Sequence, residues 1–367
     1  NIPESANNAP DILDEIFWNL EWLEAMQDTD GGVYHKLSTA NFEGILMPEN
    51  ATAQRYMDMK TTAATLNFAA VMAVASRVYA GFDSSFPGKS AAYAAASEKA
   101  WQWAIANRAV PFKPTSIHTG TYSTWSPAIT DEITWAEAEF KDEFTWAASE
   151  LFLLTGKAIY RDAMANLSSE VGVPWWGGVE PLAHISLAHN GEAVLASGDY
   201  SNIKNGVINL AEGIVAKQQA SAYDVPMAVA DFGWGSNSAA LNQGLMVYQA
   251  YQLTGDTRYL NAALAVLDYI FGRNATEYSF VTGFGALSPM APHHRPSAAD
   301  GVIDPVPGFV VGGPQPGQQD AAQCGNYPST LPAVAYIDDW CSYATNEVTI
   351  NWNAPLVYLL AAAQQGL

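Results

Sequence analysis

Apolar residues recur at helical spacing over long stretches of this chain. In the first stretch, which follows Pro10 and Asp11, they keep the i, i+3, i+4 spacing of one helix face. These positions are Ile12, Leu13, Ile16, Phe17, Leu20 and Leu23. The pattern returns over residues 61–79 and 91–107, whereas the period of two that predicts strands is scarce. The sequence therefore predicts a chain built mainly from helices.

A short motif occurs twice, about 100 residues apart. In each copy an apolar helix ends near a Thr-Gly pair, and a second helix opens three or four residues later. The copies are Thr155-Gly156 with Tyr160 and Ala163, and Thr254-Gly255 with Tyr259 and Ala262, after helices predicted over residues 144–154 and 241–253. Two such helical hairpins, with other helices between them, indicate a ring or solenoid of hairpins.

Residues 279–342 interrupt this regular pattern. They are rich in proline, glycine, asparagine and aspartate, and they show little periodicity. A loop tract of this length inside a compact domain usually has a function or is disordered. Because it holds a high density of motifs, we expect it to have a function.

The charge of the chain restricts its partners. The 37 acidic and 16 basic residues give a net charge of −21, which repels phosphate backbones and anionic lipid headgroups. Nucleic-acid and membrane partners are therefore not expected, and no uninterrupted apolar stretch reaches the ~18 residues that span a bilayer. A neutral polysaccharide is not repelled, and the 12 tryptophans offer flat apolar faces for sugars.

Two cysteines, Cys324 and Cys341, lie in or next to the loop tract. They are too few for a disulfide scaffold and lack the spacing of a four-ligand zinc site. Two explanations stay open for them, a disulfide between the two or a pair of buried thiols. An acidic, lysine-poor chain of this kind suits export, so we expect an extracellular protein.

One segment near the end of the chain concentrates candidate catalytic residues. Cleavage of a glycosidic bond needs one carboxylic acid to protonate the leaving oxygen and a second carboxylate to activate water or attack the sugar. Residues 336–348 contain Asp338, Tyr343 and Glu347, and Glu347 lies where the loop passes into the final helix. The alternative for Glu347 is a carboxylate that favours the helix dipole, worth under ~1 kcal/mol.

A second dense patch is residues 292–297 (PHHRPS), with His293, His294 and Arg295 between prolines. Adjacent histidines point in different directions, so they favour a wall that hydrogen-bonds hydroxyl groups over a metal site. The alternative is that these residues simply lie on the protein surface. Among the tryptophans, Trp234 lies in a glycine-flanked loop that enters a helix and is the first candidate for a sugar platform, with Trp125 the second. Those at helical spacing are expected to pack in the interior, and they are Trp18, Trp22, Trp101, Trp103 and Trp146.

Taken together, these motifs resemble the signatures of glycoside hydrolase family nine. The matching segments are 1–5 (NIPES), 10–15 (PDILDE), 30–35 (DGGVYH), 68–72 (FAAVM), 281–285 (VTGFG), 292–297 (PHHRPS), 311–314 (VGGP), 346–348 (NEV) and 351–355 (NWNAP). They run from the first residue to the end of the chain. The resemblance implies an all-α fold, an (α/α)6 barrel, with residues 1–367 forming a single catalytic domain with long functional loops.

The resemblance also implies an activity, the hydrolysis of β-1,4-glucan with inversion by an endoglucanase, or cellulase. Glu347 is then the general acid, and Asp338 is a supporting carboxylate. His293 and Arg295 hold the sugar, and Tyr343 lies beside the acid. The substrate is a β-glucan polysaccharide or a cello-oligosaccharide. Two rivals stay open. One is an exo-acting member of the family, such as a cellobiohydrolase, glucosidase or glucosaminidase, and the other is a non-catalytic glycan-binding toroid.

The sequence departs from the family pattern in two places. The catalytic base lies in an Asp-Ala-Gly-Asp motif upstream of the segment that resembles residues 1–5, and these 367 residues hold no such motif. We therefore expect an N-terminal piece with the first helix and the base to precede residue 1. No cofactor is required. A structural calcium ion near Asp142 and Glu143 would lack a third aspartate, because Gly178 takes that place, and the alternative is that both residues cap or pair at a helix start.

Overall fold

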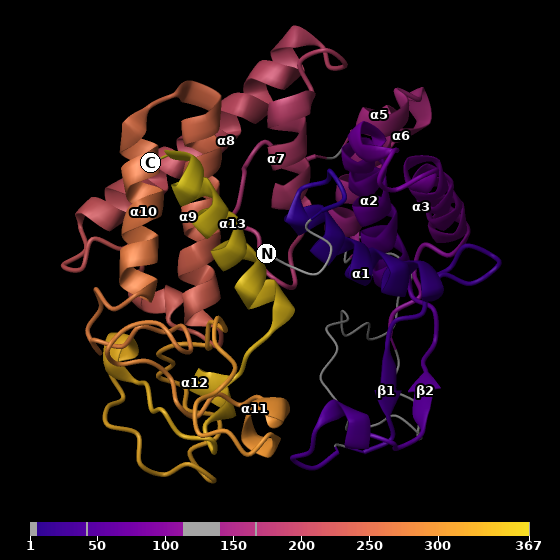
Figure 1. Cartoon of the computed structure of the whole chain (residues 1–367). Helices are drawn as coiled ribbons and strands as arrows, with labels where there is room; N and C mark the ends of the chain where they lie inside the picture. Colours follow the sequence, from indigo (N-terminus) through magenta and orange to yellow (C-terminus); the bar gives the residue numbers. More distant parts are fainter. Residues whose placement is uncertain (1–5, 42, 113–139, 166, 367) are drawn as a thin grey trace. The chain divides into compact units, whose positions relative to one another are not determined.

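The computed structural model describes residues 6–41, 43–112, 140–165 and 167–366 (Figure 1). Trp125 and the segment 1–5 lie outside these ranges. The chain divides into two compact units. Unit 1 comprises Asn1–Phe42, Ala53–Ser169 and Gly177–Tyr200, and unit 2 comprises Glu43–Thr52, Glu170–Trp176 and Ser201–Leu367.

Unit 1 is a group of helices around α2. In the ranges that the structure describes, its helices are α1 (Asp11–Ala25), α2 (Thr62–Tyr79), α3 (Lys89–Ala106), α5 (Lys141–Thr155), α6 (Ala158–Ala163) and α7 (Glu180–Asn190). Helix α2 packs against α3 and α5, and α5 also packs against α6 and α7. The periodicity predicted the first three of these helices to within two residues at each end, so this part of the prediction is confirmed.

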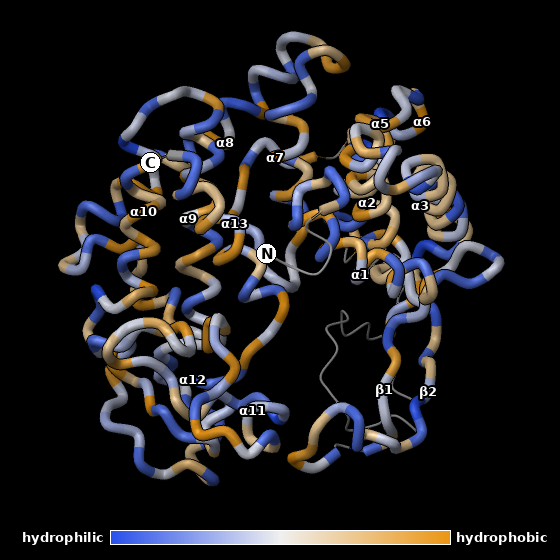
Figure 2. The backbone as a smooth tube through the Cα atoms, in the orientation of Figure 1, coloured by the Kyte–Doolittle hydropathy of each residue, from blue (hydrophilic) through white to orange (hydrophobic). Residues whose placement is uncertain are grey.

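Small residues let α2 lie close to its neighbours. Ala69, Ala70 and Ala73 are fully buried, and Ser97 of α3 donates a hydrogen bond of 2.6 Å to the carbonyl oxygen of Ala69. By length and composition alone, Thr62–Phe82 could cross a membrane, but 61% of its apolar window is buried inside the protein. Figure 2 shows the apolar character of the chain along this helix.

The tryptophans of unit 1 only partly follow the expected packing. Trp101 is buried, as predicted, with 1% of its surface exposed. The prediction is wrong for Trp18 and Trp22, which are 67% and 48% exposed. Helix α1 turns the face that bears them outward, because its buried side chains Leu13 and Leu20 lie on the opposite side.

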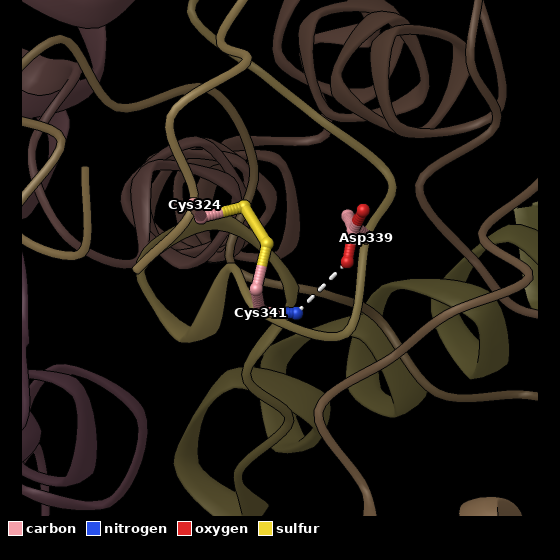
Figure 3. Close-up of side chains that lie close together, drawn as sticks. All are labelled: Cys324, Asp339 and Cys341. Carbon is pink, nitrogen blue, oxygen red and sulfur yellow. Dashed lines mark hydrogen bonds between the residues drawn. A yellow bond between two sulfur atoms is a disulfide. The ribbon is translucent and has the colours of Figure 1, made fainter. Parts of the chain in front are cut away.

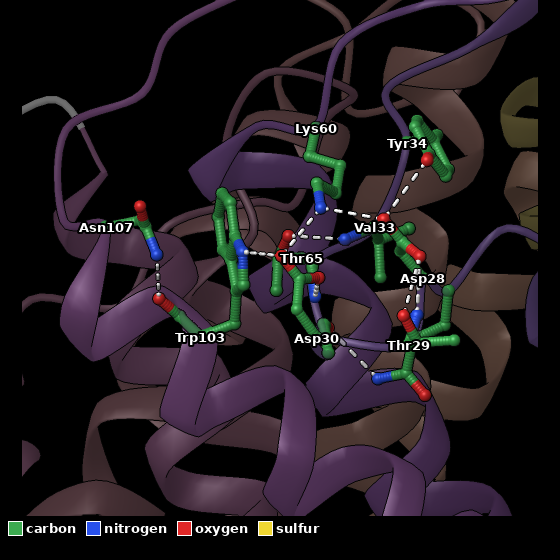
Figure 4. A network of polar contacts seen from close by, with 12 residues as sticks. Asp28, Thr29, Asp30, Val33, Tyr34, Lys60, Thr65, Trp103 and Asn107 are labelled. Carbon is green, nitrogen blue, oxygen red and sulfur yellow. Dashed lines mark hydrogen bonds and ion pairs between the residues drawn. The ribbon is translucent and has the colours of Figure 1, made fainter.

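An ionic network ties the loop after α1 to the segment before α2 (Figure 4). Lys60 Nζ lies 2.8 Å from Asp28 Oδ2 and 2.6 Å from Asp30 Oδ2, and Trp103 Nε1 donates to Asp30 over 3.2 Å. Lys60 thereby lowers the pKa of Asp30. A Cβ atom at Gly32 would lie 2.6 Å from the Trp103 ring, so the segment 30–35 needs its glycine for packing. Nearby, β1 (Leu37–Thr39) pairs antiparallel with β2 (Arg55–Met57).

Unit 2 is arranged around α9. Its helices are α8 (Ser197–Gln219, which begins in unit 1), α9 (Ser236–Thr254), α10 (Thr257–Ile270), α11 (Arg295–Ala299), α12 (Tyr343–Asn346) and α13 (Ile350–Gly366). Helix α9 packs against α10 and α13. Single 3-10 turns in the two units span Pro48–Asn50, Ala80–Phe82, Val229–Asp231 and Pro332–Val334.

The two predicted hairpins are confirmed as α5–α6 and α9–α10. Gly156 and Gly255 end the first helix of each pair in the left-handed conformation, with φ of 67° and 73°. Their amides donate to Phe152 O over 2.8 Å and to Tyr251 O over 2.7 Å. Glycine tolerates positive φ because it lacks a Cβ atom, which explains why the motif places it there.

The loop tract 279–342 contains α11 and one 3-10 turn, as its irregular pattern predicted. Cys324 and Cys341 form a disulfide, which settles the two explanations left open by the sequence (Figure 3). Two isolated bridges, Val281 with Val310 and His293 with Glu347, order the tract further. The second bridge brings both dense motifs of the sequence together.

Candidate active site

Glu347 lies between two helices and belongs to neither. It directly follows α12, with φ −58° and ψ 145°, and α13 begins three residues later at Ile350. The first turn of α13 contains no acidic residue. Glu347 therefore lies outside the first turn of the final helix, three residues before its start.

The carboxyl group of Glu347 is partly buried and has one indole partner. Trp234 Nε1 donates a hydrogen bond of 3.0 Å to Glu347 Oε2. Burial raises the pKa of Glu347, while the Trp234 bond and the charge of His293 lower it by less. Burial is therefore the cause of the rise. A raised pKa keeps this carboxyl group protonated to higher pH than an exposed glutamate.

The backbone around Glu347 is held by the segment 311–313. Gly312 N donates to Glu347 O over 3.0 Å, and Gly313 N donates to Thr345 O over 3.0 Å. Asn237, in the first turn of α9, binds the same segment, since its amide donates to Gly312 O and its Nδ2 donates to Val311 O. Gly313 has φ +89°, and a Cβ there would lie 2.5 Å from the Asn237 side chain. The VGGP motif therefore fits two glycines between α9 and the candidate acid.

His293 is held next to Glu347 by backbone and ring contacts. Its amide donates to Asn346 O over 2.8 Å, its ring stacks on Trp340 at 4.5 Å, and its Nδ1 lies 3.1 Å from Trp340 O. A carbonyl oxygen only accepts hydrogen bonds, so Nδ1 is the nitrogen that donates to it. Trp340 is a site residue that sequence reasoning missed, although it stands inside the segment 336–348.

The neighbouring residues of the PHHRPS patch have different roles. His294 points elsewhere than His293, as expected for adjacent histidines, because its Nδ1 lies 2.8 Å from Ser297 Oγ at the start of α11. Arg295 is the first residue of α11 and is half-buried. The patch thus places an imidazole beside the candidate acid and a guanidinium at the start of the next helix.

Asp338 braces the loop that carries His293. Its Oδ2 accepts from Met290 N over 2.8 Å, and its Oδ1 accepts from Ala291 N over 3.0 Å. Both oxygens are therefore occupied by backbone amides three and two residues before His293. In the structure this carboxylate supports the site through the loop.

Aromatic rings lie next to Glu347 and His293. Trp234 is 45% exposed in the turn before α9, in keeping with its glycine-flanked position. Its ring lies 5.5 Å from that of Tyr343, which lies 6.2 Å from that of His293. Gly235 has φ +78°, and a Cβ there would lie 2.8 Å from Trp352. The structure thus gathers Trp234, Tyr343, His293 and Glu347, which the sequence had singled out separately.

The two candidate calcium ligands lie in unit 1, at the start of α5. Asp142 Oδ2 accepts from Val179 N over 2.9 Å, and Glu143 is buried. Within the ranges that the structure describes, no third aspartate, glutamate, histidine or cysteine joins them at ligand distance. Two carboxylates alone do not fit the six to eight oxygens that Ca²⁺ takes. Asp142 serves here to pair with the backbone before α7, and calcium binding stays a prediction.

Comparisons with known proteins identify the family of the chain. The family model "Glycosyl hydrolase family 9" matches residues 1–360. A "Xyloglucan-specific endo-beta-1,4-glucanase" of Bacteroides ovatus is 41% identical and covers 99% of this chain and 62% of its own length. "Endoglucanase D" of Acetivibrio thermocellus is 33% identical, over 98% of this chain and 54% of its own. The chain therefore spans a little over half of the length of these relatives.

Solved structures match equally well. A chain described as "Bacteroides ovatus GH9" has a TM-score of 0.86 and 38% identity, over 99% of this chain and 64% of that one. The structure of AaCel9A "in complex with cellobiose-like isofagomine" has a TM-score of 0.87 and 32% identity, over 98% of this chain and 66% of that one. The resemblance seen in the motifs is confirmed, and the protein belongs to glycosyl hydrolase family 9, with the all-α, (α/α)6-barrel fold class of that family.

Proposed function

We propose that the protein cleaves internal β-1,4 linkages of a glucan chain with inversion, and that Glu347 donates the proton to the leaving oxygen. One observation carries this proposal. A partly buried carboxyl group with a raised pKa lies against an exposed tryptophan and a histidine. The names of the relatives, an endo-beta-1,4-glucanase for xyloglucan and an endoglucanase, support the same reaction.

The other site residues take supporting roles in this proposal. His293 and Arg295 bind hydroxyl groups of the sugar at the cleavage point, and Trp234 and Tyr343 offer ring faces to sugar C–H groups. Asp338 fixes the loop of His293. An inverting reaction also needs a carboxylate some 6.5–9.5 Å from the acid, with water between the two. These 367 residues hold no Asp-Ala-Gly-Asp motif, and we assign no residue of this chain to that role.

A leaving-group experiment tests the role of Glu347 directly. The natural full-length protein and its Glu347→Gln variant are compared on cello-oligosaccharides and on 2,4-dinitrophenyl cellobioside. Dinitrophenolate leaves without protonation, so the variant should keep most of its rate on the activated substrate. On the oligosaccharides we expect a loss of at least about 10²–10⁴-fold, the usual contribution of general acid catalysis.

The control is a folding measurement, because glutamine keeps the size of the side chain and should leave the thermal unfolding midpoint nearly unchanged. If the folded variant still hydrolyses cello-oligosaccharides at the wild-type rate, Glu347 is not the proton donor. Viscosity loss measured against reducing-sugar release separates the proposed endo action from the exo-acting rivals. Parallel assays on xyloglucan and on soluble cellulose derivatives then identify the substrate.

We also propose that the protein works outside the cell. The disulfide between Cys324 and Cys341 supports this, because such bonds persist in oxidising compartments. Thiol labelling of the protein isolated from its natural compartment tests the proposal. Two unlabelled cysteines before reduction and two labelled ones after it are expected, whereas labelling without reduction would contradict it.

A further inference from the structure

A carboxylate outside the proposed machinery is fully buried below α12. Asp320 has no exposed surface, and its Oδ2 accepts a hydrogen bond of 2.7 Å from the amide of Ala344. Its Oδ1 accepts one of 2.6 Å from the hydroxyl of Tyr327. Within the ranges that the structure describes, no ion pair joins it to a lysine, arginine or histidine. A buried polar group is costly unless it is hydrogen-bonded, and the bonds to Ala344 and Tyr327 meet this need.

The bond to Tyr327 extends the contact of Asp320 with α12. Tyr327 lies 2.7 Å from Ser342 Oγ, and that oxygen accepts from the amide of Thr345 as the N-cap of α12. Burial and the Asp320 bond raise the pKa of Tyr327 to about 12, so its hydroxyl remains a donor at any working pH. Asp320 therefore holds the short helix twice, once directly and once through Tyr327 and Ser342.

Helix α12 has four residues, and Glu347 is the next residue in the chain. The amide of Glu347 donates to Tyr343 O over 3.1 Å, so its backbone is part of the same turn. The amides of Gly313 and His293 also bind this turn, at Thr345 O and Asn346 O, and a shift of α12 moves Glu347 with it. Within the part of the chain that the structure describes, no hydrogen bond or ion pair joins the Asp320 and Glu347 side chains, and Asp320 does not contribute to the raised pKa of Glu347.

We propose that Asp320 is a positioning residue, which sets the place of the Glu347 carboxyl group through α12. This inference rests on the proposed role of Glu347 as the proton donor. Asp320 should then affect only the step in which Glu347 donates its proton. Steps that do not need the proton, such as the departure of an activated leaving group, should depend on Asp320 much less.

The test compares Asp320→Ala with Asp320→Asn in the natural full-length protein, on the same two substrates as above. Asparagine can still accept from the Ala344 amide and can donate to Tyr327, so it should restore most of the activity. For Asp320→Ala we expect kcat on cello-oligosaccharides to fall about 10- to 100-fold, the size of a small misplacement of a catalytic group, with little change in KM. On 2,4-dinitrophenyl cellobioside kcat should change by less than about threefold.

A double-mutant cycle separates this role from general damage to the fold. Once Glu347→Gln has removed the proton donor, Asp320→Ala should lower the remaining activity on cello-oligosaccharides no further. As a matched control, Asp14→Asn changes another buried aspartate, which lies in α1 of unit 1 and accepts from Asn7 over 2.6 Å. This control should not distinguish the two substrates.

The outcomes are distinct. If Asp320→Ala lowers the rates on both substrates equally, or lowers the rate in the Gln background as well, the positioning role is wrong. If it lowers neither rate, the role is also wrong. Should Asp320→Ala fail to fold, Tyr327→Phe removes one of the two links to α12 and should give a smaller loss on cello-oligosaccharides alone. If Glu347→Gln hydrolyses cello-oligosaccharides at the wild-type rate, the proposed function is wrong. That result would not bear on the hydrogen bonds between Asp320 and α12.

Discussion

The hairpins α5–α6 in unit 1 and α9–α10 in unit 2 end their first helices in the same way. Thr155 and Thr254 each donate to the carbonyl oxygen four residues earlier over 2.7 Å. Each then accepts from the amide two residues later, over 3.3 Å and 3.2 Å. Gly156 and Gly255 have nearly equal φ angles between these bonds. The repeated residues thus produce a repeated turn.

The starts of the same two helices differ. At the start of α5, Asp142 binds the backbone amide of Val179. At the start of α9, Asn237 binds the segment 311–313, and Trp234 just before the helix donates to Glu347. The C-terminal ends of α5 and α9 share a sequence motif and form the same turn in both hairpins. The starts of the two helices differ in sequence, and only the start of α9 contacts the candidate site.

The largest effect is expected for Gly313→Ala, which disturbs the close contact between Gly313 and the Asn237 side chain at the start of α9. The new Cβ would meet the Asn237 side chain at 2.5 Å, and φ of +89° is unfavourable for alanine. We expect the free energy of unfolding to fall by about 2–4 kcal/mol, from backbone strain and overpacking together. Chemical denaturation of the whole protein measures the loss.

A matched variant isolates the packing part of this loss. Gly301 also has positive φ, of +77°, but no atom lies within 4 Å of its added Cβ. Gly301→Ala should therefore cost about 1–2 kcal/mol, from the backbone alone. Equal losses for the two variants would show that the contact with Asn237 is not tight.

The next variant, Trp234→Phe, removes the hydrogen bond that the Trp234 indole donates to Glu347. The indole N–H stabilises the ionised carboxylate, so its removal should raise the pKa of Glu347 further. The protonated acid then persists to higher pH, and the fall of kcat/KM on the alkaline side should move upward. Trp340→Phe is the control, because Trp340 stacks on His293 and should leave this fall in place. A downward shift for Trp234→Phe would contradict the assignment.

The smallest expected effect tests whether the turns at Gly156 and Gly255 are equivalent. Gly156→Ala and Gly255→Ala place a Cβ in open space at φ of +67° and +73°. Each should lower the free energy of unfolding by about 1–2 kcal/mol, because only the left-handed backbone is penalised. Thermal unfolding of both variants should give nearly the same loss. Clearly unequal losses would mean that the two turns are not equivalent.

The helices and hairpins could be predicted because their signals are local. Apolar spacing fixed the bounds of α1, α2 and α3, and the Thr-Gly motif fixed the turns after α5 and α9. The exposure of Trp18 and Trp22 could not be predicted in this way. Spacing shows that two residues share a helix face, but what lies against that face is decided by distant segments.

The site could be predicted as a set of motifs and not as a geometry. The sequence singled out Glu347, His293 and Trp234, yet it could not show that the Trp234 indole binds Glu347, since the two residues are 113 positions apart. Trp340 and Asn237 were missed because a tryptophan and an asparagine carry no local catalytic signal. Asp338 was identified, but its bonds to two backbone amides became visible only in the structure.

The pH dependence of kcat/KM for 4-nitrophenyl cellobioside, measured for the natural full-length protein and for Glu347→Gln, tests the central claim most directly. In the wild type the rate should fall on the alkaline side as the proton donor ionises, at a pH raised by the burial of Glu347. In the variant this fall should be absent, because glutamine does not ionise. An alkaline fall that persists unchanged in the folded variant would assign proton donation to another group.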